Sequence, residues 1–177
     1  GFIHRGVSYW EDGDESRIII ATGDSHLIAL DPKTGATYSD FGEDGKVDLR
    51  NGLNLRPRVS EHQVNSPPII CNNVIVVGSV IFDRPSMQKY VRGDIRGFDP
   101  RTGETLWTFH SIPQEGEFGN ETWEEDSWKY SGSTNAWSLL SADEELDYIY
   151  IPFGAATNDF YGGHRPGDNL FATSLVC

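Results

Sequence analysis

Short runs of apolar, β-branched residues recur along the chain, and each is bounded by Gly, Pro, Asp or Asn. Such runs are typical of β-strands that end in turns. No window places apolar residues at i, i+3, i+4 and i+7 for three turns, as an amphipathic helix would. The pattern therefore predicts an all-β chain, with strands at residues 17–23, 26–31, 67–72, 73–80, 94–99, 105–110, 136–143, 148–154 and 171–177.

Two segments of the chain repeat one pattern. GDSHLIALDPKTGATY (residues 23–38) and RGDIRGFDPRTGETLW (residues 92–107) both contain an apolar residue followed by x-D-P-[KR]-T-G. In each segment we expect a strand to end at the Asp, Pro to set the first central residue of a tight turn, and Gly to take a left-handed conformation. Repetition of a unit of about four strands indicates β-propeller blades rather than a sandwich hairpin.

The net charge of the chain argues against some classes of binding partner. The chain has 27 acidic and 14 basic residues and a net charge of −13, which argues against binding to nucleic acid or to an anionic membrane surface. Cys71 and Cys177 lie far apart and form neither a zinc spacing nor a C-x-x-C motif. The longest apolar run, residues 74–82, is too short to span a bilayer. Because the chain opens on Gly1 without Met, we expect a fragment of a longer protein.

The hairpin that ends at Trp107 resembles the tryptophan-docking motif of the quinoprotein dehydrogenases, whose eight-bladed propeller holds pyrroloquinoline quinone (PQQ). RGVSYW (residues 5–10), STNAW (residues 133–137) and RPGDN (residues 165–169) are also similar to segments of that family. The third is similar to a loop of the membrane-bound glucose dehydrogenases, and the adjacent Cys-Cys pair of the methanol-oxidising enzymes is absent from the sequence. The resemblance implies that residues 1–177 form about two to three blades of one propeller domain, truncated at both ends.

A PQQ site follows from this resemblance. PQQ is a planar tricarboxylate, and the guanidinium of Arg5 can engage a carboxylate through two parallel hydrogen bonds. Trp137 follows small polar residues, which leaves one indole face free to stack on a flat ring. Family members also place polar side chains near the cofactor after the first blade. The predicted cofactor contacts are Arg5, Asn65, Ser66, Thr134, Asn135 and Trp137.

The family's calcium ion has a less complete set of candidate ligands. In many relatives an Asn that ligates the metal follows the strand-ending Gly, whereas here Gly154 is followed by Ala155 and Ala156. A shifted loop could bring other oxygens to the metal, because Ca²⁺ accepts varied oxygen geometries. The predicted metal ligands are Asp83, Thr157 and Asn158.

The resemblance implies a periplasmic, PQQ- and calcium-dependent dehydrogenase that oxidises a glucose-like sugar or an alcohol. A membrane quinone would accept the electrons, and the resemblance leaves open an inner-membrane anchor outside this chain. No stretch matches the family loop that carries the catalytic aspartate, so we assign no catalytic residue and expect the isolated chain to be inactive. His4 and His164 flank the candidate sites, and a structural role is the simpler interpretation of both.

Two other interpretations stay open. A non-catalytic propeller that acts as a scaffold or assembly lipoprotein would explain the repeated turns, but it gives no reason for RGVSYW or for the small residues before Trp137. A carbohydrate-binding module would use Trp123, Trp128 and Tyr161 as exposed aromatic rings.

Overall fold

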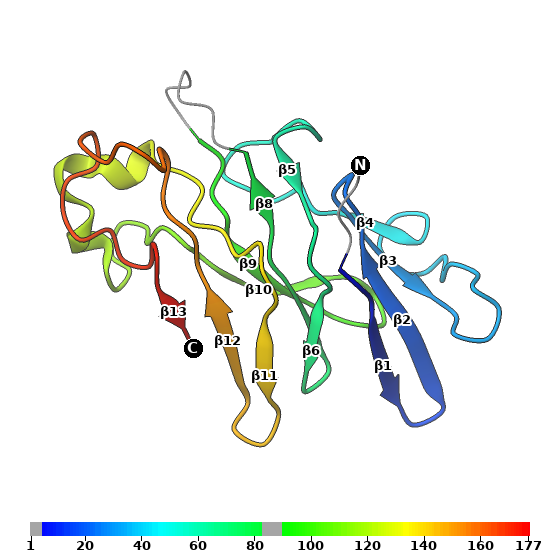
Figure 1. Ribbon diagram of the computed structural model, residues 1–177. Coiled ribbons are helices and arrows are strands. Elements are labelled where there is room, and N and C mark those ends of the chain that lie inside the picture. Colours follow the sequence, from blue (N-terminus) through cyan, green and yellow to red (C-terminus); the bar gives the residue numbers. More distant parts are fainter. Residues whose placement is uncertain (1–4, 83–89) are drawn as a thin grey trace.

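The computed structural model describes residues 5–82 and 90–177, so His4 and Asp83 lie outside the described residues. Three antiparallel sheets of three or four strands stand side by side in the order of the sequence (Figure 1). Each sheet is built from strands that are close in sequence, as expected of successive blades. The prediction of an all-β, partial propeller is confirmed.

The strands and their pairing are as follows. The first sheet has the order β1 (Ser8–Asp12), β2 (Glu15–Ala21), β3 (His26–Leu30) and β4 (Lys46–Asp48). The second has the order β10 (Thr105–Phe109), β9 (Ile95–Phe98), β7 (Val74–Val77) and β6 (Ile69–Cys71). The third has the order β11 (Ser141–Asp143), β12 (Tyr148–Pro152) and β13 (Leu175–Val176). A separate pair joins β5 (His62–Gln63) to β8 (Val80–Ile81).

Two short 3-10 helices, η1 (Asn120–Thr122) and η2 (Glu124–Lys129), lie between β10 and β11. Over residues 5–82 and 90–177, no helix has the length and apolar character needed to cross a membrane.

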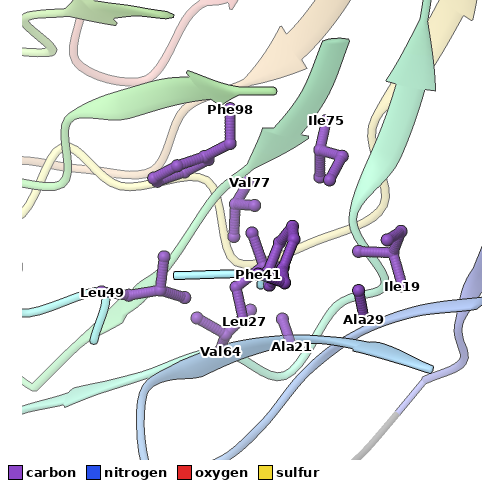
Figure 2. Close-up of a cluster of buried hydrophobic side chains, with 10 residues drawn as sticks. All are labelled: Ile19, Ala21, Leu27, Ala29, Phe41, Leu49, Val64, Ile75, Val77 and Phe98. Carbon is purple, nitrogen blue, oxygen red and sulfur yellow. The ribbon is translucent and has the colours of Figure 1, made fainter. Parts of the chain in front are cut away.

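The central sheet is covered on both faces. Ile75 and Val77 of β7 belong to a buried cluster shared with the first sheet (Figure 2). Val76 points the other way and belongs to a cluster shared with the third sheet. Because successive side chains of a strand point to opposite faces, the unbroken apolar run of β7 is what a strand between two other sheets requires. The members of the first cluster are Ile19, Ala21, Leu27, Ala29, Phe41, Leu49, Val64, Ile75, Val77 and Phe98.

The two repeated turns have the same hydrogen bonds. The Asp31 carboxylate accepts the main-chain N–H groups two and three residues further on, at 2.8 and 2.7 Å, and Asp99 does the same at 2.7 and 2.8 Å. Gly35 and Gly103 donate their N–H to the carbonyl of the same Asp, with φ of 73° and 74°. The predicted turn chemistry is therefore confirmed in both copies.

The repeats differ in the aromatic residue that follows the turn. Trp107 lies flat against the main chain of Gly97, where an added Cβ would stand 2.3 Å from the indole. Tyr38 instead donates its hydroxyl proton to the Ser16 carbonyl at 3.1 Å. The first blade is thus closed by a hydrogen bond and the second by an aromatic ring stacked on a glycine.

The strand prediction was wrong at several ends. The predicted strand 73–80 is interrupted after Val77, where the Ser79 N–H donates to the Ala136 carbonyl at 2.9 Å. This close approach requires Gly78, because an added Cβ there would lie 2.2 Å from the same carbonyl oxygen. The predicted strand 136–143 is regular only in β11, and the predicted strand 171–177 is regular only in β13. The pattern also missed β1, which is rich in polar residues, and the short strand β4.

Candidate functional site

The Trp137 segment (residues 133–137) lies where three other parts of the chain meet. Its main chain is hydrogen-bonded to residues 91–93, to Ser79 and to residues 154–155, with distances of 2.8 to 3.1 Å. Ser133 and Thr134 both have left-handed backbones, with φ of 54° and 47°. Residues other than Gly seldom adopt this conformation unless their surroundings impose it. The position of Trp137 is therefore set mainly by main-chain contacts on three sides.

The Trp137 pocket is a cavity of about 240 Å³ beside the indole. The Trp137 side chain is not covered by the core, since the residue is 51% exposed. An exposed indole face is what stacking on a flat ligand requires. The residues that line the pocket are Val80, Ile81, Phe82, Ser133, Asn135, Trp137, Gly154, Ala155 and Asp159.

Arg5 and Ser66 meet at the main chain of Trp137. Arg5 Nη1 donates to the Trp137 carbonyl at 3.0 Å and to Ser66 Oγ at 3.4 Å. The Ser66 hydroxyl donates to the same carbonyl at 2.7 Å, and the Arg5 main-chain N–H donates to the Asn65 carbonyl at 3.1 Å. The Arg5 Cζ lies 5.8 Å from the centre of the indole. The structure thus brings together four residues that lie as much as 132 positions apart in the sequence.

Buried hydroxyl groups beside the pocket lack partners. Within the described part of the chain, Thr134 Oγ1 and Ser79 Oγ are buried and form no hydrogen bond. Each such group costs about 1–3 kcal/mol unless something satisfies it. Asn135 is also buried, and its side-chain nitrogen donates to the Ser79 carbonyl at 2.7 Å. The exposed indole and the neighbouring guanidinium together fit a flat ligand that carries carboxylates.

Of the three predicted metal ligands, the structure describes Thr157 and Asn158, whereas Asp83 lies outside the described residues. Thr157 is fully buried with its hydroxyl 2.8 Å from Ser133 Oγ, and Asn158 Oδ1 accepts the Tyr90 hydroxyl at 3.2 Å. Neither residue lines the pocket, whereas Ala155 does. Over the described ranges, no three His, Cys, Asp or Glu side chains form a group that could hold a metal ion. The role of these residues as metal ligands stays a prediction.

The sequence patterns did not single out Asp159, which lines the pocket next to Ala155. The following residues, Phe160 and Tyr161, are strongly exposed, at 103% and 67%. The available signal was an acidic residue between two glycine positions, Gly154 and Gly162, in a loop already matched to the family. A single carboxylate in a loop is too common a feature to be assigned from the sequence alone.

The aromatic residues proposed for a carbohydrate-binding module do not form one surface. Trp123 is 2% exposed, and its indole N–H donates to the Leu170 carbonyl. Trp128 is half-buried against the same cluster, while Tyr161 is exposed. The expectation of exposed rings was therefore wrong for Trp123, which fills the core beneath η1 and η2.

Comparisons with known proteins identify the family of the chain. The family model described as the β-propeller domain of glucose/ethanol/alcohol dehydrogenases (PQQ) matches residues 1–177. The chain is 33% identical to the quinoprotein glucose dehydrogenase of Gluconobacter oxydans (strain 621H), over 99% of this chain and 24% of that protein. It is 32% identical to the quinoprotein glucose dehydrogenase of Escherichia coli (strain K12), over 97% and 22%. It is 34% identical to the quinate/shikimate dehydrogenase (quinone) of Acinetobacter baylyi, over 90% and 19%.

Solved structures show the same fold. A quinohemoprotein alcohol dehydrogenase from Pseudomonas putida HK5 superposes with a TM-score of 0.74 at 23% identity, over 99% of this chain and 26% of that one. The enzyme of the same type from Comamonas testosteroni gives 0.72 at 21% identity, over 99% and 27%. The chain spans about a quarter of the length of the relatives it matches. By its repeated turns, its sheets and these matches, the chain belongs to the β-propeller domain family of PQQ-dependent glucose, ethanol and alcohol dehydrogenases.

Proposed function

We propose that this chain is the part of a PQQ-dependent dehydrogenase that forms one side of the cofactor site. The observation that carries the proposal is the half-exposed indole of Trp137, which borders a pocket and has Arg5 bonded to its own carbonyl. A flat, multiply charged cofactor needs both an apolar surface to stack on and a cation to pair with.

Each predicted contact has a definite role in this proposal. Trp137 stacks on the ring system, and Arg5 pairs with a carboxylate of the cofactor. Ser66 orients Arg5, since both side chains bond to the Trp137 carbonyl. Asn135 lines the pocket, and Thr134 holds the wall beside it by donating its main-chain N–H to the Ala155 carbonyl at 3.1 Å. Asn65 contributes its main chain by holding the Arg5 backbone. When bound, PQQ provides the quinone that takes up the two electrons removed from the substrate.

The substrate of the whole protein is proposed to be a sugar of the glucose type or an alcohol. Three relatives are named as glucose dehydrogenases, and others are named for quinate or shikimate, glycerol, alcohol and methanol. All these names denote molecules with an oxidisable hydroxyl group. The name of the quinate/shikimate enzyme includes a quinone, and we propose a membrane quinone as the electron acceptor here too. A site facing the periplasm, with or without an inner-membrane anchor, is part of this proposal.

Calcium is part of the proposal only as the metal that the family resemblance implies. Asp83, Thr157 and Asn158 remain its predicted ligands. The scaffold alternative has no support from the site or from the comparisons.

The test uses the full-length parent protein, loaded with PQQ with and without Ca²⁺. PQQ affinity is measured by calorimetry, and dye reduction is measured with glucose, other sugars and simple alcohols. We expect Trp137→Ala to weaken PQQ binding strongly and Trp137→Phe to weaken it less, because phenylalanine keeps a flat ring. An intact parent that does not bind PQQ would overturn the proposed function.

A further inference from the structure

The Ala155 segment (residues 154–158) forms the side of the pocket next to the Trp137 segment. Gly154 and Ala155 line the pocket. An added Cβ on Gly154 would lie 3.5 Å from Trp137 Nε1, so this backbone passes close to the indole. Gly154 donates its N–H to the Asn135 carbonyl at 3.0 Å, and the Ala155 carbonyl accepts the Thr134 N–H at 3.1 Å. Any shift of this segment therefore changes the space beside the indole.

On its other side, the Ala155 segment is held by two neighbouring side chains. Arg165 donates through Nε to the Thr157 carbonyl at 3.2 Å and through Nη2 to the Asn158 carbonyl at 3.4 Å. His164 Nε2 donates to the same Thr157 carbonyl at 3.0 Å. Main-chain bonds hold the side of the segment that faces Trp137, and these two side chains hold the side that faces away.

Arg165 is itself anchored in a well-packed loop. Its Nη1 donates to Asn169 Oδ1 at 2.6 Å, and Asn169 is 3% exposed. The Asn169 N–H donates to the Thr122 carbonyl of η1 at 3.0 Å. An added Cβ on Gly167 would lie 2.2 Å from the same carbonyl, so the loop is packed tightly against η1. The guanidinium therefore connects the core around η1 to the wall of the pocket.

The chemistry of the side chain suits this role. A guanidinium has five donors in a rigid plane and can bind three acceptors in fixed directions, whereas a lysine ammonium cannot reproduce that fork. Burial lowers the pKa of Arg165 and nearby Asp159 opposes the effect, so the charge is partly balanced from within the pocket loop. No side chain of the RPGDN motif (residues 165–169) lines the pocket. The motif contacts the pocket wall through the hydrogen bonds of the Arg165 guanidinium to the Thr157 and Asn158 carbonyls.

We propose that Arg165 is a positioning residue, which fixes the Ala155 segment at the spacing from Trp137 that a flat cofactor needs. This inference rests on the proposed function, because it assigns Arg165 to the same PQQ site. Arg165 acts through the main chain of Thr157 and Asn158 and does not contact the ligand.

The experiment compares three variants of the full-length protein. Arg165→Lys removes the fork but keeps the charge, and Arg165→Gln removes both. Arg50→Lys is the matched control, because Arg50 also forms a two-pronged contact, to Asp48 at 2.8 and 2.7 Å, in the first sheet. PQQ dissociation constants are measured by calorimetry, thermal midpoints by circular dichroism, and dye reduction over a range of PQQ concentrations.

We expect the PQQ dissociation constant to rise about tenfold in both Arg165 variants, as expected for the loss of one or two hydrogen bonds. Arg50→Lys should lower the thermal midpoint without changing that constant. Because the defect is one of affinity, saturating PQQ should restore most of the dye reduction. If Arg165→Gln does not fold, Arg165→Lys alone decides the question.

Two outcomes separate the inference from the proposed function. If the wild-type protein binds PQQ and both Arg165 variants bind it within about twofold, the role of Arg165 is purely structural and the inference fails. If the wild-type protein itself does not bind PQQ, the proposed function fails first, whatever the variants do.

Discussion

The guanidinium of Arg101 lies over the indole of Trp10, with its Cζ 4.7 Å from the ring centre. Arg101 belongs to the second repeated turn, and Trp10 is a buried residue of β1 in the neighbouring sheet. The same guanidinium pairs with Asp12 and with Glu15, the latter at 2.9 Å. The turn that closes one blade therefore also ties it to the blade before it.

Replacing Arg101 should weaken this junction. A cation over an aromatic ring contributes about 0.5–2 kcal/mol, and exposed ion pairs contribute about 0–1 kcal/mol each. We expect Arg101→Gln to lower the free energy of unfolding by about 1–3 kcal/mol, and Arg101→Lys to lower it less. Denaturant unfolding measures the change, with Arg58→Gln as the control because the exposed Arg58 side chain pairs with Glu61, three residues away. If the Arg101→Gln and control variants are equally stable, the contacts of Arg101 with the first sheet do not stabilise the protein.

Gly97 should tolerate no side chain. An added Cβ would stand 2.3 Å from the Trp107 indole, so the ring would have to move. We expect Gly97→Ala to cost about 1–3 kcal/mol of stability, as other overpacked sites do. Gly162→Ala is the control, because its Cβ would meet only Arg165 atoms at 3.5 Å or more. Near-ultraviolet circular dichroism should show the displaced indole in the first variant only, and an unchanged spectrum would argue against the stacking.

Stability should fall with acid because of His62. This side chain is 2% exposed, and its Nδ1 lies 2.9 Å from Ser25 Oγ. Burial, with Arg96 and Arg50 adding to it and Asp48 opposing it, lowers the pKa of His62 to about 3 from an ordinary value of 6.5. Below pH 6.5 the unfolded chain takes up a proton that the folded chain refuses, so stability is lost as the pH falls from 6.5 towards 3.

The pH dependence of the free energy of unfolding can be tested with a His62 variant. From about pH 6.5 to about pH 4.5 the loss should be about 2–3 kcal/mol. Most carboxylates stay ionised in that interval, so the difference between wild type and His62→Gln isolates the histidine. His62→Gln should show a flatter profile in denaturant unfolding at the two pH values. A variant with the slope of the wild type would show that another group titrates.

The planar guanidinium of Arg5 should contribute to the affinity for PQQ. In the full-length protein we expect Arg5→Gln to weaken PQQ binding by about ten- to a hundredfold, the range of a lost charge-assisted pair. Arg5→Lys should recover only part of this, because an ammonium does not match a carboxylate with two parallel bonds. Calorimetry at two salt concentrations measures both variants. Arg56→Gln, at an exposed arginine of the first blade, should leave the affinity unchanged, and an equal loss there would point to a general charge effect.

Ala155 offers a gain-of-function test for the metal. The family resemblance implies an Asn ligand at this position, and Ala155 does line the pocket. We therefore expect Ala155→Asn to raise Ca²⁺ affinity several-fold in the full-length protein, because it adds an oxygen of the kind that calcium accepts. Terbium luminescence sensitised by nearby tryptophan measures the binding. Ala155→Val, which adds bulk without an oxygen, should give no gain, and a gain with valine would separate the effect from ligation.

The turns and strands whose structure depends on residues adjacent in sequence could be predicted from the sequence. The Asp, Pro and Gly residues of the repeated turns specify their own hydrogen bonds, and both turns form as expected. The apolar run of β7 correctly indicated a strand, which the structure buries on two faces. The sequence also brought forward Arg5, Ser66 and Trp137, which the structure places in contact.

The features that could not be predicted depend on contacts between segments that lie far apart in the sequence. The break at Gly78 is caused by Ala136, which lies far along the chain, and no local pattern reveals it. The fork of Arg165 depends on carbonyl groups, and every residue has a carbonyl group. The place of Asp159 in the pocket follows from the fold of a loop that is rich in glycine. Residues of these kinds become visible only when the main chain has been traced.

The Trp137 segment is held mainly through its main-chain amide and carbonyl groups, and this affects how the protein can be redesigned. Its shape depends little on which side chains it carries, apart from the residues that tolerate the left-handed turn. Libraries that vary Asn135 or Trp137 should thus yield folded proteins with altered ligand preference. Libraries at Gly78 or Gly93, where an added Cβ would collide with this segment, should mostly yield proteins that do not fold.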